Sequence, residues 1–600
     1  MQRVPFRAAA IAAGVSVFLA ACGGSSSDDG TTTPPPKVLS ITGKAATGAA
    51  MANAAVSAKC ATGTGTGTAA TDGSYTLSIT SGALPCVLQA TGTDSHGNAV
   101  TLHSVATTTT AQITPLTELL MAQVTGAEPS ATLGLTDLSS LTTTFSDANV
   151  LAAQAQVVAL LSAAGIDTSS LGSDSLFSGT LTVGGATGYD HVLDLLGNSL
   201  AASGTPLATL TDTVASQASD GGATTASASA LAPELLLRPA SANCASLRSG
   251  KYWVVTSAST NGDAAQLMTI DAVTGTITQV SDGSSSTLQA NGTCRFTAMD
   301  PDVGATADIM VSPAGVIVAR SLDGSDYKLA VGVPQQSHTL AQAAGDWDTI
   351  FSDTSDTGPG WVFGYGRSTV TSSASGTTLQ LQQACQYEIG AEMPACIANA
   401  TDTPTALRSL TLSDDGTFVE HSANDTGDGG PWSDKFFVYQ AGNGEWFMIS
   451  SNILTPDSSG DGSIGFATRH KVLSVPAVGT TSSNWNVYMN TATQLSTNGV
   501  DSNAHHIDSV NVQAGQFVRT TGTNGGATHQ ETLAINNPLE GFEFRDGATG
   551  VATSDGGTTN VRRSIFLKVP GMGISVLYQP VQAGITPNSR LVVSVEQPSS

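Results

Sequence analysis

The sequence predicts a multidomain, mainly β protein, with an N-terminal β-sandwich, a small α-helical region and a large all-β C-terminal region built from repeated β units. The chain has 600 residues, enough for roughly four domains. Hydrophobic residues make up 40% of it and charged residues 12%, whereas ordinary disordered chains are highly charged and poor in apolar residues. Val, Ile, Leu and Phe repeatedly alternate with Thr and Ser, which is the pattern of half-buried strands.

The net charge excludes one class of partner. The chain has 22 Lys and Arg residues against 47 Asp and Glu residues, which gives a formal net charge of −25. Proteins that bind nucleic acid carry basic surfaces that neutralise phosphates. We therefore expect no nucleic-acid partner.

The amino terminus has the layout of an export signal. Arg3 and Arg7 precede an apolar stretch over residues 8–21. The stretch is shorter than the roughly 20 residues that span a bilayer, and a charged segment followed by an apolar one is typical of signal peptides. Residues 1–22 are therefore predicted to direct export.

The end of this stretch, Leu19-Ala20-Ala21-Cys22, resembles the lipobox of bacterial lipoproteins. The resemblance implies that Cys22 becomes the first residue of the mature chain and is acylated on its thiol and amino group. Several acyl chains anchor a protein stably in a membrane. Residue 23 is Gly instead of the Asp that favours inner-membrane retention in enterobacterial-type sorting, so we expect a lipid anchor in the outer membrane, with the cell surface and the periplasmic face both left open. The alternative is an ordinary cleaved signal followed by a chance cysteine.

Residues 23–36, GGSSSDDGTTTPPP, are predicted to be a flexible tether. Gly and Ser give flexibility, and consecutive prolines favour an extended chain. The tether would set the first folded domain away from the lipid surface.

Six cysteines remain after the one expected to carry lipid, and an oxidising compartment favours disulfides between them. Six cysteines allow 15 connectivities, but two lie in each of three compositional blocks, so the economical prediction pairs neighbours. No Cys-x-x-Cys motif occurs, and no cysteine lies at metal-ligand spacing from a histidine, so a zinc or redox role is not favoured. The expected pairs are Cys60 with Cys86, Cys244 with Cys294, and Cys385 with Cys396.

Residues 37–111 are expected to form the β-sandwich. Asp72-Gly73 is a turn pair, and Tyr75, Leu77 and Ile79 then alternate as a half-buried strand does. Together with the earlier Gly43 to Gly48 and Ala54-Ala55-Val56 segments, these residues resemble the carboxypeptidase-regulatory-like domain, a small prealbumin-like β-sandwich. The family usually has Pro where this chain has Ala50 or Met51. The resemblance implies a spacer or binding module and transfers no catalytic residues.

Residues 112–215 are expected to be helical. Pro115 opens a segment to Val124 with apolar residues three and four positions apart, and Ser146-Asp147 can cap a second helix whose apolar residues share one face. A third helix is expected over residues 190–202. We interpret the region as a packed spacer rather than a ligand-binding bundle. Residues 216–241, rich in Ala, Ser, Thr and Gly, are predicted to be a linker.

Residues 242–600 have short apolar runs separated by turn signals, the pattern of an all-β region. Gly315, Gly416 and Gly515 each precede a predicted strand and lie 101 and 99 residues apart. This spacing suggests two or three repeated β units of about a hundred residues. Gly250 and Gly345 are expected to begin successive units, and Gly345-Asp-Trp347 resembles the opening of lipocalin-type barrels, although the other motifs of that family are not visible.

One segment matches a calcium-binding pattern. Asp457, Ser459, Asp461 and Ser463 place oxygen ligands around Gly462, as an EF-hand-like loop does. The twelfth position is Thr468 instead of the usual bidentate Glu, and both flanks look like strands, so a polar hairpin loop is the preferred interpretation. Calcium is the single cofactor that the sequence suggests.

The sequence assigns no catalytic residue. The Gly-x-Ser-x-Gly motif of α/β-hydrolases is missing, and His505 and His506 are adjacent, so on a strand they would point to opposite faces and could not easily share a metal. We predict a non-enzymatic outer-membrane lipoprotein that presents β-rich modules to an unknown protein or glycan. The alternatives are an anchored hydrolase acting on polysaccharides or esters, and a structural envelope protein.

Overall fold

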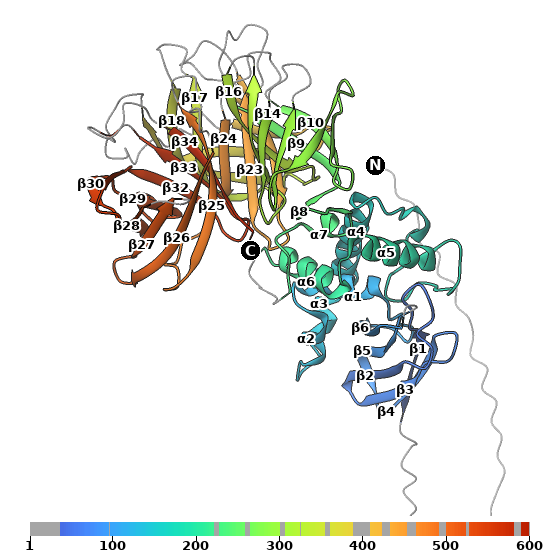
Figure 1. Cartoon of the computed structure of the whole chain (residues 1–600). Helices are drawn as coiled ribbons and strands as arrows, with labels where there is room; N and C mark the ends of the chain where they lie inside the picture. Colours follow the sequence, from blue (N-terminus) through green and yellow to red (C-terminus); the bar gives the residue numbers. More distant parts are fainter. Residues whose placement is uncertain are drawn as a thin grey trace, which may run out of the picture.

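In the computed structural model, the described parts of the chain form a small β module, a group of helices and three closed β-barrels, in that order (Figure 1). The predicted multidomain, mainly β fold with repeated β units is confirmed. The structure describes residues 37–94, 97–220, 227–257, 265–299, 306–323, 326–354, 361–387, 408–422, 432–452, 464–490, 500–523, 527–580, 582 and 590–598.

The N-terminal module has two facing sheets, one of β1 and β4 and one in the order β3-β2-β5-β6. Gly73 adopts a positive φ of 79° in the turn before β4, and Tyr75, Leu77 and Ile79 then point into the core as predicted. Cys60 and Cys86 lie opposite each other on β2 and β5 and form a disulfide. The strands are β1 (Val38–Lys44), β2 (Ala55–Thr62), β3 (Thr64–Thr68), β4 (Ser74–Thr80), β5 (Ala83–Thr93) and β6 (Ala99–Ala106).

The helices lie between this module and the barrels (Figure 1). Thr114 caps α1 by accepting a hydrogen bond from the Thr117 amide, and Pro115 occupies the first turn, where its missing N–H is not needed. Ser146 caps α4 as predicted. The helices are α1 (Pro115–Thr125), α2 (Pro129–Leu133), α3 (Leu141–Thr144), α4 (Asp147–Ala163), the short 3₁₀ helix η1 (Ser169–Leu171), α5 (Tyr189–Ser203), α6 (Leu207–Ala218) and α7 (Pro233–Leu236).

The segment predicted to be a linker is partly built into the fold. Helix α6 extends to Ala218, and α7 lies within the expected linker with Leu231, Leu235 and Leu236 buried. The amide of Gly442 in the second barrel donates to the carbonyl of Ala230 over 3.0 Å. The leucines explain the difference, because burying them outweighs the flexible composition around them.

Each barrel is a closed antiparallel sheet of eight strands. Gly250 and Gly345 begin the first strands of the first and second barrels, as expected for unit starts. The first barrel contains β9 (Gly250–Thr256), β10 (Ala265–Asp271), β11 (Thr276–Gln279), β12 (Ser285–Ala290), β13 (Arg295–Met299), β14 (Thr306–Val311), β15 (Ile317–Asp323) and β16 (Asp326–Pro334). The second contains β17 (Gly345–Thr354), β18 (Trp361–Ser373), β19 (Gly376–Tyr387), β20 (Arg408–Leu412), β21 (Phe418–Ser422), β22 (Trp432–Gln440), β23 (Trp446–Asn452) and β24 (Ile464–Arg469).

In the third barrel, β29 pairs directly with β32, and the intervening β30 and β31 form a separate hairpin. The strands of the barrel are β25 (Thr481–Asn490), β26 (Val500–Asn511), β27 (Gln516–Thr523), β28 (Thr528–Ile535), β29 (Phe542–Arg545), β32 (Ser564–Val569), β33 (Ile574–Gln579) and β34 (Arg590–Glu596), and the hairpin is β30 (Ala548–Ala552) with β31 (Thr558–Val561). A further pair, β7 (Ala240–Ser241) and β8 (Cys244–Arg248), precedes the first barrel. The Cys244–Cys294 disulfide ties β8 to the residue before β13.

The three glycines spaced about a hundred residues apart do not mark equivalent hairpins. Gly315 lies between the sixth and seventh strands of the first barrel, Gly416 between the fourth and fifth of the second, and Gly515 between the second and third of the last. All three adopt positive φ angles, of 78°, 84° and 60°. They recur because tight hairpin turns favour a residue without a Cβ at such positions.

The outward faces of the barrels pack against one another. The ring of Trp253 in the first barrel lies 5.1 Å from that of Phe437 in the second, and Tyr365 of the second lies 5.4 Å from Phe542 of the third. Strand β25 of the third barrel contacts β15 and β16 of the first. Each barrel therefore touches the other two through buried apolar residues. No helix in the described parts of the chain is both long and apolar enough to cross a membrane.

Candidate functional site

Most residues singled out in the sequence lie outside the described ranges. These are Cys22, Cys396 and the calcium-loop candidates Asp457, Ser459, Asp461 and Ser463. Cys385 lies on β19, but its side chain is not among those described. The twelfth loop position, Thr468, is on β24, where its hydroxyl donates to the carbonyl of Trp446 over 2.7 Å.

The two adjacent histidines lie on β26 and point to opposite faces, as predicted. His505 Nδ1 lies 3.0 Å from Thr521 Oγ1 inside the third barrel, whereas His506 Nδ1 lies 2.9 Å from the Asp508 carboxylate on the exposed side. Among the described residues, no group of three or more His, Cys, Asp or Glu side chains could hold a metal ion.

In the third barrel, strand β29 has apolar side chains on its outer face and charged side chains on its inner face. Phe542 and Phe544 point outward toward the rest of the core, while Glu543 and Arg545 occupy the other face. Glu543 pairs in register with Phe566, whose ring belongs to the apolar interior of this barrel. Since paired residues on neighbouring strands share a face, the charged side chains of β29 lie inside.

Glu531 on β28 is the centre of an interior ion-pair network. Its carboxylate accepts hydrogen bonds from Arg519 Nε at 2.6 Å, Thr521 Oγ1 at 2.8 Å and Arg545 Nη1 at 2.7 Å, and its side chain is 1% exposed. Burial alone would raise the pKa of Glu531, but the two guanidinium groups outweigh this effect and hold the pKa well below its usual value. Glu531 is therefore ionised inside the barrel.

All three guanidinium nitrogen atoms of Arg545 donate hydrogen bonds to neighbouring groups. Besides Glu531, it donates through Nε to the carbonyl of Arg562 at 2.8 Å and through Nη2 to Ser564 Oγ at 2.7 Å. Its guanidinium carbon also lies 5.7 Å from the centre of the Phe566 ring. These contacts fix both the side chain and the backbone that enters β32.

A second pair of arginines, Arg562 and Arg590, has no such partners. Nη1 of Arg562 and Nε of Arg590 are buried and have no hydrogen-bond partner among the described residues. No ion pair within 4 Å joins either guanidinium to a described carboxylate. Burial and the neighbouring charge of Arg590 lower the pKa of Arg562 to about 10, so both side chains stay positively charged near neutral pH.

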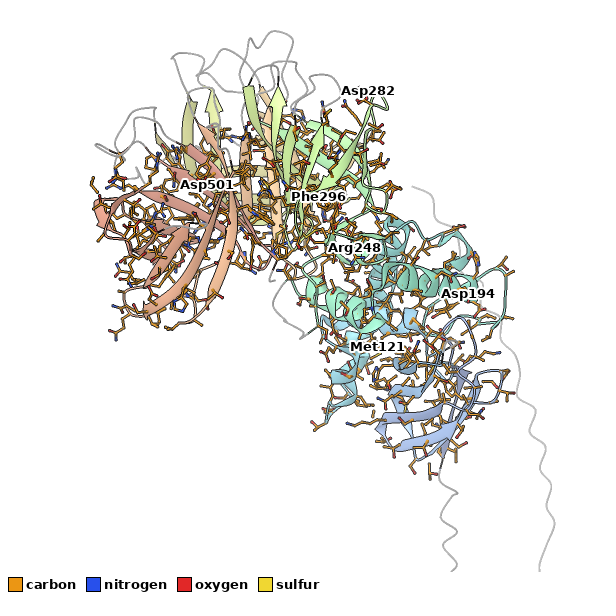
Figure 2. The ribbon with its side chains drawn as sticks, viewed as in Figure 1. Met121, Asp194, Arg248, Asp282, Phe296 and Asp501 are labelled. Carbon is orange, nitrogen blue, oxygen red and sulfur yellow. A yellow bond between two sulfur atoms is a disulfide. The ribbon has the colours of Figure 1, made fainter. Side chains whose placement is uncertain are left out.

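Two further groups lie beside these arginines. The Tyr488 ring centre is 5.5 Å from the guanidinium carbon of Arg590, and Asp501 is the nearby carboxylate whose charge acts on the Tyr488 hydroxyl. Asp501, labelled in Figure 2, lies near the start of β26. Burial and then the charge of Asp501 raise the pKa of Tyr488, so its hydroxyl keeps its proton.

Sequence reasoning singled out His505 of this interior but missed its arginines. The available signal was the Phe542-Glu543-Phe544-Arg545 segment, in which apolar and charged residues alternate. Such a strand normally places its charged face in solvent. The expectation fails here because neighbouring barrels bury the apolar outer face, which leaves the barrel interior for the charged side chains.

No protein-family model and no curated protein sequence matches the chain. Similar solved structures include a protein of unknown function of the DUF3598 family from Nostoc punctiforme PCC 73102, with 12% identity, 43% of this chain and 97% of that chain covered, and a TM-score of 0.14. Another is a double mutant of transferrin binding protein B from Haemophilus parasuis Hp5, with 11% identity, 59% and 76% covered, and a TM-score of 0.17. Transferrin binding protein B from Neisseria meningitidis serogroup B has 12% identity, 56% and 63% covered, and a TM-score of 0.13. We draw no conclusion about function from likenesses at these TM-scores.

Proposed function

We propose that this protein is a lipoprotein of the bacterial outer membrane, anchored through Cys22, which binds a ligand in the interior of its third barrel without chemically changing it. The observation that carries the proposal is the set of buried polar atoms in that interior that have no partner among the described residues. They include Glu543 Oε1 and Gln579 Oε1 as well as the arginine nitrogen atoms named above.

The binding part of the proposal rests on the free energy that folding loses when these polar atoms are buried without hydrogen bonds. Burying a polar atom without a hydrogen bond costs about 1–3 kcal/mol, and most buried polar atoms in proteins are paired. Glu543 and Gln579 are only 5% and 6% exposed. Small closed barrels commonly fill their interior with apolar side chains or hold one small ligand there. A ligand that supplies the missing hydrogen-bond partners explains why these interior side chains are polar.

The anchoring part rests on the sequence. The charged and apolar segments, the Leu19-to-Cys22 lipobox and the tether over residues 23–36 are arranged as in exported lipoproteins. In this proposal, the carboxypeptidase-regulatory-like module and the helices serve as a spacer between membrane and barrels.

Lipidation can be tested by metabolic labelling with palmitate in a bacterial host. We expect the wild-type protein to take up the label and to sediment with outer membranes, whereas Cys22→Ala should do neither. Protease treatment of intact cells, with a periplasmic protein as the leakage marker, then determines which side of the membrane the barrels face. Labelling of the Cys22→Ala variant, or wild-type protein free of lipid, would refute the anchor.

Ligand binding in the third barrel can be tested with the purified protein in detergent and a panel of sugars, amino acids, nucleotides and dicarboxylates. We expect at least one probe to raise the melting temperature of the wild type by several degrees. Gln579→Leu should lose this shift, because it replaces a buried interior amide. Gln530→Leu is the matched control, since Gln530 lies on the exposed face of β28. A panel without any shift, or a shift that Gln579→Leu preserves, contradicts binding at this place.

A further inference from the structure

Resting on the proposed function, we propose that the ligand of the third barrel carries an oxyanion, a carboxylate, sulfate or phosphate group, and that Arg562 and Arg590 bind it. Arg545 acts as a positioning residue behind them. The inference follows from the register of the strands, the balance of charge inside the barrel and the donors left without partners.

The strand register places the polar side chains in one arc. Arg545 pairs with Ser564 across β29 and β32, and Gln579 pairs with Arg590 across β33 and β34. The Ser564 hydroxyl joins the two pairs, because it accepts hydrogen bonds from Arg545 at 2.7 Å and from Gln579 Nε2 at 3.2 Å. The hydrogen-bonded row therefore spans β29, β32 and β33, and Arg590 lies beside its end on β34, joined to it by register alone.

Arg562 is held next to this row by its backbone. Its carbonyl accepts hydrogen bonds from Arg545 Nε and, at 3.2 Å, from Ser564 Oγ. These bonds fix the start of its side chain but occupy none of the guanidinium donors. All three guanidinium nitrogen atoms of Arg545 therefore donate hydrogen bonds within the protein. Arg562 and Arg590 each keep a buried nitrogen atom that can donate to a ligand.

The charge balance identifies the kind of group that fits. Positive charge is in excess in this part of the interior. Five cationic side chains, those of Arg519, Arg545, Arg562, Arg590 and Lys568, stand against the three carboxylates of Glu531, Glu543 and Asp501. The whole chain, by contrast, has a formal charge of −25. Like charges buried together without counterions are destabilising, and planar guanidinium groups match the geometry of oxyanions, to which they can donate two parallel hydrogen bonds.

Isothermal titration calorimetry of the purified protein in detergent separates the candidate groups. The probes are glucose, glucuronate, glucose 6-sulfate and glucose 6-phosphate, which share a neutral body, together with inorganic phosphate and sulfate. We expect the wild type to bind at least one oxyanion but not glucose, with affinity that falls as salt rises. The double variant Arg562→Gln with Arg590→Gln should weaken this binding about tenfold or more, because charge-assisted hydrogen bonds are lost.

Arg563→Gln is the matched control, because the adjacent Arg563 pairs with the exposed Asp546 instead of facing the interior. It should leave the affinity unchanged. Without ligand, the double variant should melt no lower than the wild type, since it removes repelling charges. A clearly lower melting point would make the arginines structural and overturn the inference.

The remaining outcomes distinguish this inference from the proposed function. If glucose or another neutral probe binds as well as the anions, and Gln579→Leu abolishes binding while the arginine variant does not, the barrel is a ligand site but the oxyanion assignment is wrong. Failure of every anionic probe to bind the wild type also overturns the assignment. The melting panel with Gln579→Leu then decides the proposed function by itself.

Discussion

Replacing Glu531 with Gln should destabilise the third barrel by about 3–5 kcal/mol, because it leaves buried guanidinium charges without a counterion. Arg519 Nε and Arg545 Nη1 both donate to the Glu531 carboxylate. The amide keeps nearly the same volume, so packing is preserved and the loss is electrostatic. Chemical denaturation of the whole protein, followed by circular dichroism, measures the change.

The pH dependence of the stability difference between the wild type and Glu531→Gln supplies a second test. The folded-state pKa of Glu531 is depressed, so its ionisation stabilises the protein above the ordinary pKa of 4.5. That contribution is lost as the pH falls through the lower, folded-state value. The gap between wild type and Glu531→Gln should therefore be widest near neutral pH and shrink in acid. Glu596→Gln is the control, because Glu596 is exposed at the end of β34, and it should change stability by less than about 0.5 kcal/mol. A loss for Glu531→Gln no larger than this would mean that the network contributes little.

The fold was largely predictable where local signals act alone. The turn at Asp72-Gly73 and the alternation of Tyr75, Leu77 and Ile79 needed nothing beyond their own strand. The helix starts at Pro115 and Ser146 were similarly local. The linker prediction failed because burial of Leu235 and its neighbours depends on the barrels, which lie far along the chain.

The candidate site was not predictable by the same reasoning. Glu531 and Arg545 are only 14 residues apart on paired strands, but the sequence does not show that their charged face is the inner one, and only the closed strand order brings Arg590 of β34 to the same interior. Spacing along the chain also misled, because the Gly315, Gly416 and Gly515 turns look like a repeat although they belong to different hairpins. Turn chemistry is local, whereas barrel closure and register are properties of the whole unit.

The second large effect is expected at Tyr439, where three parts of the chain meet. Its hydroxyl donates to the carbonyl of Ala314 in the first barrel at 2.7 Å and accepts from the amide of Ala232 at 3.3 Å. The side chain is fully buried, so Tyr439→Ala should cost about 3–5 kcal/mol through the space left in the core. Tyr439→Phe keeps the ring but leaves both backbone groups unpaired, which should cost about 1–3 kcal/mol.

Because these contacts join separate units, the loss should appear as weaker docking before it appears as unfolding of a barrel. We expect the wild type to unfold in one calorimetric transition and Tyr439→Ala to unfold in two, and limited proteolysis should cut the variant sooner near residues 227–241. Val512→Ala is the control, since Val512 is 73% exposed and lies away from the junction. If Tyr439→Ala melts in one transition at the wild-type temperature, the barrels are held together by their other apolar contacts, and the junction at Tyr439 is not what makes the helices and barrels one body.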